Sequence, residues 1–271
     1  FSGFPPQVPA DNPTGCYRTT FSVPSSWRGR RIVLHVGGAE SVLYAWVNGA
    51  AIGMSKDSRL EAEFDVTEHV RSGERNTFAA MVIRWSDASY VEDQDQWWHA
   101  GIHRSVLVYA TPRTRVEDVH AAAGLADDLT TGTLHVTTHV VFDEPDRRDG
   151  WAVEVRLTDA RGRAVGEVLR GEVPRTRQAY LFDGHVVRLA TTVPGVARWS
   201  AEQPNLYGLR VTLFDPAGEV RDEVDLRVGF RRVEVVGREL LVNGEPVLFR
   251  GVNRHDFDPD TGRVVSVDDM R

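Results

Sequence analysis

The sequence has 271 residues, enough for about two domains, and its 41% hydrophobic and 26% charged content is ordinary for a folded chain. The formal net charge is −7 and the densest basic run is Arg28-Gly29-Arg30-Arg31, which argues against nucleic acid or an acidic membrane as a partner. No apolar stretch reaches the roughly 18 to 20 residues of a membrane span, and no signal-peptide pattern opens the chain. Cys16 is the only cysteine, so no intrachain disulfide can form, and we expect a cytoplasmic protein.

Apolar and polar residues alternate with a period of two along much of the chain. This pattern predicts antiparallel strands with one face on a core and the other in water. Many short strands separated by frequent turns are typical of β-sandwiches, so the sequence predicts an all-β fold. The predicted strands are residues 32–36, 43–47, 77–85, 106–109, 151–157, 207–213 and 224–228.

Turn signals punctuate these strands. Asn48-Gly49 and Asn243-Gly244 each follow an apolar run and predict tight hairpin turns, and a turn is expected at 215–218. The strand pattern changes near residues 110–115 and again near 229–231. We therefore expect domain boundaries at these two places.

The C-terminal residues predict half of a βα unit. Residues 246–251 have the composition of a buried strand, and a polar loop follows over 253–262. Ser266 with Asp269 three residues later has the form of a helix N-terminus. A strand, a loop and one helical turn with nothing after them favour a truncated chain. A lone apolar strand invites association, so we expect residues 246–271 to be disordered or to fold onto another chain.

Two polar clusters are candidates for chemistry. Residues 92–95 place three carboxylates within four positions, followed by Trp97 and Trp98. Such a loop could contribute oxygen ligands to a hard cation, but the composition alone favours a solvated acidic loop. His255 precedes Asp256 and Asp258, and the residues alone likewise favour a solvated loop histidine over a metal ligand.

A series of motifs ordered along nearly the whole chain resembles bacterial β-galactosidases of glycoside hydrolase family 2. One such motif would be weak support, whereas the ordered series is highly specific. The motifs include Asn12-Pro13-Thr14-Gly15-Cys16-Tyr17, Trp46-Val47-Asn48-Gly49, Arg84-Trp85-Ser86-Asp87, Glu92-Asp93-Gln94-Asp95, Pro204-Asn205-Leu206-Tyr207 and Arg250-Gly251-Val252-Asn253-Arg254-His255.

The resemblance implies a division into three parts. Residues 1–112 correspond to a jelly-roll sugar-binding domain without its first strands, and residues 113–231 to an immunoglobulin-like β-sandwich. Residues 232–271 correspond to the leading hairpin, first strand and first helical turn of a TIM-barrel catalytic domain. Active sites of such barrels lie at the C-terminal ends of the strands, and His255 follows such an end.

The resemblance also implies roles for two residues. Asp95 matches an aspartate that binds sodium and contacts the galactosyl group, and His255 matches a histidine that hydrogen-bonds the galactosyl hydroxyls. Where the family commonly has further histidines, this chain has Asp256-Phe257-Asp258. Asn12 is interpreted as structural.

No catalytic residue is expected in this chain. Retaining glycosidases need two carboxyl groups about 5 Å apart, and the resemblance places both glutamates on later barrel strands. The intact enzyme is expected to use Na⁺ and Mg²⁺, of which this chain alone is expected to hold neither stably. The expected partners of the intact enzyme are a galactoside substrate and further copies of itself in a homo-oligomer.

Two alternatives from other classes stay open. The chain could be an autonomous carbohydrate-binding module that uses Asp95, Trp97 and Trp98, although a fold alone does not establish a function. It could also be an assembly module that supplies subunit interfaces.

Overall fold

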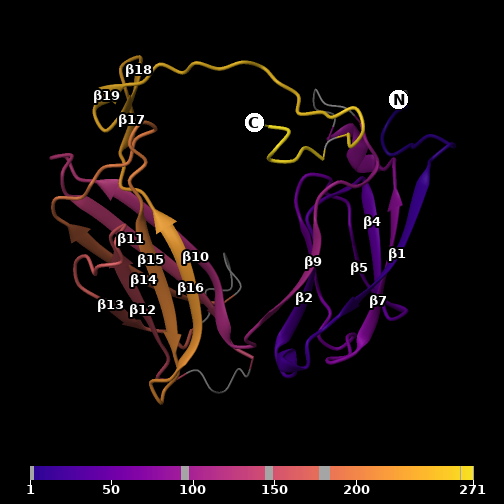
Figure 1. Cartoon of the computed structure of the whole chain (residues 1–271), viewed down its shortest axis with the longest axis horizontal. Coiled ribbons are helices and arrows are strands. Elements are labelled where there is room, and N and C mark those ends of the chain that lie inside the picture. The colour runs from indigo at the N-terminus through magenta and orange to yellow at the C-terminus, as the bar shows by residue number, and fades with distance from the viewer. Residues whose placement is uncertain (1–2, 93–97, 144–148, 177–183, 263, 271) are drawn as a thin grey trace. The chain divides into compact units, whose positions relative to one another are not determined.

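The computed structural model describes residues 3–92, 98–143, 149–176, 184–262 and 264–270. The described residues are almost all in strands, turns and loops, which confirms the all-β fold. The chain forms two compact units (Figure 1). The first contains residues 1–111 and 252–271, and the second contains residues 112–251.

The first unit is built from two antiparallel sheets. One has the strand order β1–β7–β4–β5 and the other has the order β6–β2–β9, with β3 and β8 forming a short separate pair. Two short 3₁₀ helices, η1 and η2, lie in the connections. The bounds are β1 Thr14–Ser22, η1 Ser25–Trp27, β2 Arg31–Val36, β3 Ala39–Glu40, β4 Val42–Val47, β5 Ala50–Ser55, β6 Ala62–Asp65, β7 Arg75–Ile83, η2 Asp87–Tyr90, β8 Gly101–Ile102 and β9 Val106–Thr111.

The core of the first unit lies between these sheets. Leu34 of β2 and Phe78 of β7 are both buried there, as the alternating pattern requires. The Asn48-Gly49 turn joins β4 to β5 with positive φ at both positions, 51° and 88°, so the predicted type I′ hairpin is confirmed.

The second unit is a second sandwich. Its sheets have the strand orders β10–β11–β14 and β13–β12–β15–β16, and its core contains Leu209, Leu213 and Phe230 (Figure 1). The turn at 215–218 joins β15 to β16 as predicted. The Asp215 carboxylate accepts hydrogen bonds from the N–H of Ala217 within the turn and from that of Glu219 just after it. The bounds are β10 Arg115–Leu125, β11 Gly132–Val141, β12 Ala152–Thr158, β13 Leu169–Glu172, β14 His185–Val193, β15 Tyr207–Phe214 and β16 Val220–Val228.

A small antiparallel sheet follows in the same unit, formed by β17 Val233–Val236, β18 Glu239–Val242 and β19 Glu245–Pro246. The Asn243-Gly244 turn has positive φ at both positions, 53° and 81°, so this predicted hairpin is also confirmed. The Asn243 side chain is buried, accepts from the N–H of Arg232 at 3.0 Å and donates to the carbonyl of Trp199 at 3.0 Å. These bonds fix the hairpin to the sandwich that precedes it.

The predicted strand over residues 246–251 is not present. The last strand, β19, ends at Pro246, and Leu248 and Phe249 are exposed on an irregular segment. Directly after β19, the Val247 N–H donates to the Leu240 carbonyl. An apolar run becomes a buried strand only where neighbouring strands pair with it, and the described residues supply no such neighbour here.

The described residues after 251 group with the first compact unit, and the expectation that residues 246–271 are disordered or fold onto another chain stays a prediction. The predicted helix is not formed after Ser266, where residues 267–270 make a turn, but the hydrogen bonds of the predicted N-terminus are present. The Ser266 hydroxyl accepts from the N–H of Asp269 at 3.2 Å, and the Asp269 carboxylate accepts from the N–H of Ser266 at 2.9 Å. This is the reciprocal pattern of a capping box.

Candidate functional site

The loop between β7 and β8 carries most of the motif residues that pointed to a site. Near its start, Ser86 caps η2 reciprocally with Ser89. The Ser86 hydroxyl also lies 2.6 Å from that of Ser41, and both serines are buried. Buried hydroxyls that pair with each other and with the backbone fix the direction in which the loop leaves the sheet.

Glu92 fastens this loop to a neighbouring one. Its carboxylate accepts from the Ser58 N–H at 2.8 Å and from the Ser58 hydroxyl at 2.6 Å, and Ser58 is fully buried. Asp57 shapes the same neighbouring loop, because backbone N–H groups of Leu60 and Arg59 bond to its carboxylate and lower the pKa of Asp57. A charged acceptor held by two donors is among the stronger hydrogen-bonded arrangements in proteins.

An aromatic platform joins the two ends of the loop. The rings of Trp85 and Trp98 lie 4.9 Å apart, and the Arg84 guanidinium lies 4.6 Å above Trp85. The Asn12 side chain bonds both the N–H and the carbonyl of Trp85, each at 2.9 Å. Asn12 therefore has the structural role that the sequence indicated.

The tail of the chain reaches the same loop. The ring of Phe257 stacks on that of His99 with centroids 5.7 Å apart and an interplanar angle of 26°. His255, two residues before Phe257, is exposed. The loop that carries the Glu92–Asp95 motif and the segment that carries His255 therefore meet within one compact unit.

The two residues assigned to the site from the sequence differ in whether the structure describes them. Asp95 and Trp97 lie outside the residues that the structure describes, so the role of Asp95 stays a prediction. His255 is described, and its role also stays a prediction. Sequence reasoning included Ser58 only as part of the motif Asp57-Ser58-Arg59-Leu60, without a role, and it did not predict the pairing of His99 with Phe257. For that pairing, the departure from the family pattern at 256–258 was the available signal.

A metal site is not assembled by the described residues alone. Across the described ranges, no three His, Cys, Asp or Glu side chains are grouped so that they could hold an ion. The described acids of the loop are instead engaged with the protein, as Glu92 is with Ser58 and Asp87 with Lys56 at 2.7 Å. The Lys56 ammonium is the main cause that lowers the pKa of Asp87.

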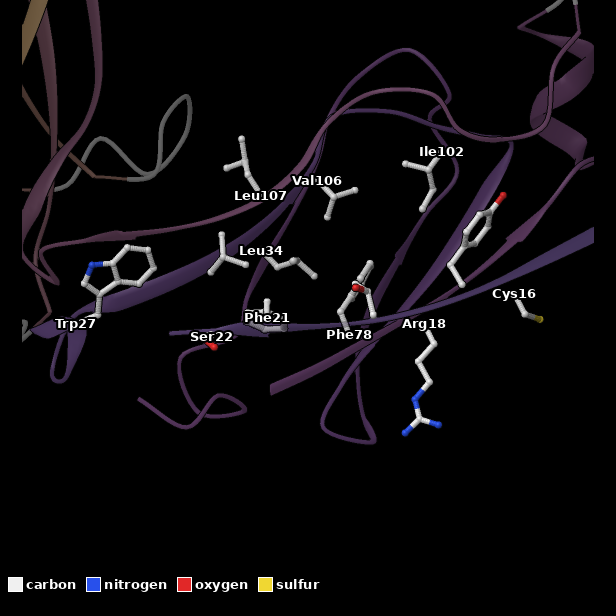
Figure 2. Close-up of a pocket in the computed structure, with 13 residues that line it drawn as sticks. Cys16, Arg18, Phe21, Ser22, Trp27, Leu34, Phe78, Ile102, Val106 and Leu107 are labelled. Atoms are coloured by element: carbon white, nitrogen blue, oxygen red, sulfur yellow. The ribbon is translucent and has the colours of Figure 1, made fainter. Parts of the chain in front are cut away.

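A separate apolar groove opens between β1 and β9, with a volume of about 680 Å³. Figure 2 shows the side chains of Leu34, Ile102 and Val106 facing this space together with Phe21 and Phe78. Among the described residues, β1 pairs only with β7 and β9 only with β2, so each presents one unpaired edge. The groove is an unfilled part of the sandwich rather than a polar site.

Comparison with known families covers almost the whole chain. Residues 4–112 match the model "Glycosyl hydrolases family 2, sugar binding domain", and residues 114–231 match "Glycosyl hydrolases family 2". Residues 233–271 match "Glycosyl hydrolases family 2, TIM barrel domain". The chain belongs to glycosyl hydrolase family 2. The fold agrees, because both sandwiches described above fall in the ranges matched by the first two models.

Curated relatives of this family-2 chain carry the name β-galactosidase. The chain is 41% identical to the protein from Photobacterium profundum over 98% of its residues, and 38% identical to that from Psychromonas ingrahamii over 100%. It spans about a quarter of the length of these relatives, 25% and 26% respectively.

Solved structures show the same fold. A family-2 glycosyl hydrolase from Bacteroides cellulosilyticus covers 93% of this chain with a TM-score of 0.78 at 20% identity, and the match takes up 33% of that protein. A β-glucuronidase from Ruminococcus gnavus covers 93% with a TM-score of 0.77 at 22% identity, over 42% of its own length. Among the described residues, no helix is long and apolar enough to cross a membrane.

Proposed function

We propose that this chain is the N-terminal, non-catalytic part of a retaining β-galactosidase that hydrolyses terminal β-D-galactosyl groups. The observation that carries the proposal is 41% identity to a β-galactosidase across 98% of the chain. The likeness to β-glucuronidase structures, at 22% identity, supports the fold alone and not their substrate.

In this proposal, Asp95 and His255 form one wall of the galactosyl subsite. A carboxylate accepts hydrogen bonds from sugar hydroxyls, and an imidazole can donate or accept one at each nitrogen. Such bonds contribute to rate when they strengthen as the sugar distorts toward the transition state. The proposal is supported by the described flanks, because Glu92 anchors the loop before Asp95 and Phe257 joins the His255 segment to the same loop.

The chemical step is assigned to residues outside this chain. Retention needs one carboxyl group as nucleophile and another as acid and base, about 5 Å apart. We assign neither role to a residue here and propose that both glutamates lie in the remaining three quarters of the protein. The chain alone is therefore expected to be inactive.

The proposal includes Na⁺ at Asp95 and Mg²⁺ elsewhere in the intact enzyme. Both are hard cations that prefer oxygen ligands, and a single aspartate with water does not make a dedicated site. The described residues do not complete such a site, so no step of the reaction is derived through either ion. We also propose that the intact enzyme is a cytoplasmic homo-oligomer that acts on a galactoside.

The test is hydrolysis of nitrophenyl-β-galactoside, with Na⁺ and Mg²⁺ present, by the 271-residue chain and by the full-length protein. Turnover by the full-length protein alone is the expected result, with nitrophenyl-β-glucuronide as the control substrate. Turnover by the purified chain would show that its own carboxylates perform the chemistry. A full-length protein that cleaves only the glucuronide would contradict the proposed substrate.

A further inference from the structure

The residue before His99, Trp98, is held in place by several contacts. Its ring packs on Trp85 and its carbonyl accepts from the Arg84 guanidinium at 3.4 Å. Trp85 is in turn held by both functional groups of the Asn12 side chain. A side chain that follows such a platform is well suited to receive another segment, because its backbone has little freedom to lose on docking.

The segment that docks on His99 is itself a tight turn. The Asp258 carboxylate accepts from the N–H groups of Asp260 and Thr261 at 2.9 and 2.7 Å, and the backbones of Asp258 and Gly262 bond each other in both directions. The N–H of Thr261 is the main cause that lowers the pKa of Asp258. The turn is therefore ordered by its own bonds and can move as one piece.

His99 lies between the two ends of this turn. Its ring stacks on Phe257 just before the turn, and its Cε1 and Nδ1 atoms lie 3.6 and 3.8 Å from the position that a Cβ on Gly262 would occupy. Gly262 has a φ of +67°, a left-handed conformation that glycine adopts readily. The imidazole therefore lies close to both ends of the 257–262 turn, and only its stack on Phe257 is a direct ring contact.

We propose that Phe257 is a positioning residue: by stacking on His99 it holds His255, two residues earlier, beside the loop between β7 and β8. The inference rests on the proposed function, because the contact of His255 with a galactosyl group is itself a proposal. The family resemblance leads one to expect further histidines after His255, whereas this chain has Asp256-Phe257-Asp258. In this chain, Phe257 of that segment makes the stack on His99. Stacked rings attract each other beyond the effect of the apolar area that they bury, so the pair favours the docked position of the segment.

The test uses the 271-residue chain labelled with ¹³C and ¹⁵N for NMR. In Phe257→Ala, the His99 ring signals should lose the shift caused by the stacked ring, and the His255 ring signals should change position. Exchange of the Thr261 and Gly262 amides should accelerate about tenfold. Phe257→Tyr keeps the ring and should retain the native signals. Val252→Ala is the matched control, because Val252 is 90% exposed on the same segment.

The global unfolding transition separates positioning from a general structural role, because it should stay in place in all three variants. Unmoved His99 and His255 signals in Phe257→Ala would overturn the inference, and so would a Phe257→Tyr variant as disturbed as Phe257→Ala. Failure of the proposed function is recognised separately, as a lack of galactoside turnover by the full-length protein while these signals behave as expected.

Discussion

The two sandwiches of this chain differ in how their sheet edges meet. In the second unit, the N–H of Val116 on β10 donates to the Asp222 carboxylate on β16 at 2.9 Å and ties the edges of the two sheets together. In the first unit, the edges formed by β1 and β9 are separated by the apolar groove. The alternating pattern of a strand decides which of its faces points inward, but not whether the space between two edges is closed.

The groove also differs from the charged strand surfaces found on both units. Charges pair across neighbouring strands in each, as Arg31 does with Asp65 at 2.9 Å between β2 and β6, and Arg210 with Asp225 at 2.7 Å between β15 and β16. At the groove of the first unit, Tyr17 and Leu107 are 40% and 45% exposed instead. Cross-strand ion pairs are typical of a sheet surface that faces water, whereas exposed apolar side chains at a sheet edge are not.

The largest expected effect is on the free energy of unfolding. It is found by comparing a phenylalanine in the core of the second unit with one that lines the groove of the first unit. Phe230 is 0% exposed and packs edge-on to Tyr207 at 5.1 Å, so Phe230→Ala should lower the free energy of unfolding of the second unit by about 3–5 kcal/mol. Phe21 lines the groove and is only half-buried, so Phe21→Ala should cost less than half as much. Urea unfolding followed by fluorescence measures both, and equal losses would show that the groove is as closed as the second core.

A smaller effect is expected from the two asparagine clamps. Asn243 is buried and bonds the backbone of Arg232 and Trp199, so Asn243→Ala leaves buried groups unpaired and should cost about 1–3 kcal/mol. Asn12 makes its two bonds to Trp85 in a half-buried position, and Asn12→Ala should cost about 1 kcal/mol. Hydrogen exchange should become faster in the hairpin of residues 233–246 in Asn243→Ala but not in Asn12→Ala. Faster exchange of this hairpin in both variants would contradict the separate roles of the two asparagines.

A charged side chain at the groove edge should weaken the binding of apolar molecules to the groove and leave the free energy of unfolding almost unchanged. Leu107→Glu places a carboxylate at the groove and should reduce the fluorescence of an added apolar dye, while the free energy of unfolding changes by about 0.5 kcal/mol or less. Val220 of β16 is 52% exposed but does not line the groove, so Val220→Glu is the control and should leave the dye signal unchanged. Equal dye loss in both variants would contradict a groove-specific apolar surface.

The smallest expected effect is local and depends on pH. The Thr131 hydroxyl and the backbone N–H groups of Thr131 and Thr130 lower the pKa of Asp128 from 3.8 to about 2. The stabilisation of this turn is therefore complete above pH 3.8 and is lost as pH falls through about 2. Amide protection at Thr130 and Thr131 should follow that loss, and Asp128→Asn should abolish its pH dependence. Loss of protection already near pH 4 in the native chain would contradict the lowered pKa.

The sequence predicted the parts of the fold that depend on local chemistry. Alternation located β12, β15 and β16, and the Asn48-Gly49 and Asn243-Gly244 pairs located their hairpins, because positive φ at both positions is a local demand. The resemblance supplied the family. The strand expected at 246–251 failed because a buried strand needs partners that lie elsewhere in the fold.

The site was less accessible to sequence reasoning. His99 and Phe257 are far apart in the chain, and neither residue type reveals that the two rings stack. Ser58 and Glu92 likewise pair across two loops, and Glu92 alone is interpreted equally well as a solvated acid. Such contacts depend on where the sheets place each loop.

The most direct test of the account is Asp95→Asn in the full-length protein, assayed over a range of Na⁺ concentrations. The account predicts that kcat/KM for nitrophenyl-β-galactoside falls about 100-fold or more and that the response to Na⁺ is lost. Asp127 of the second unit has a fully exposed side chain paired with Arg232, and Asp127→Asn should leave kcat/KM unchanged. An Asp95→Asn enzyme with native kcat/KM and a native Na⁺ response would show that the first unit does not contribute this wall of the galactosyl subsite.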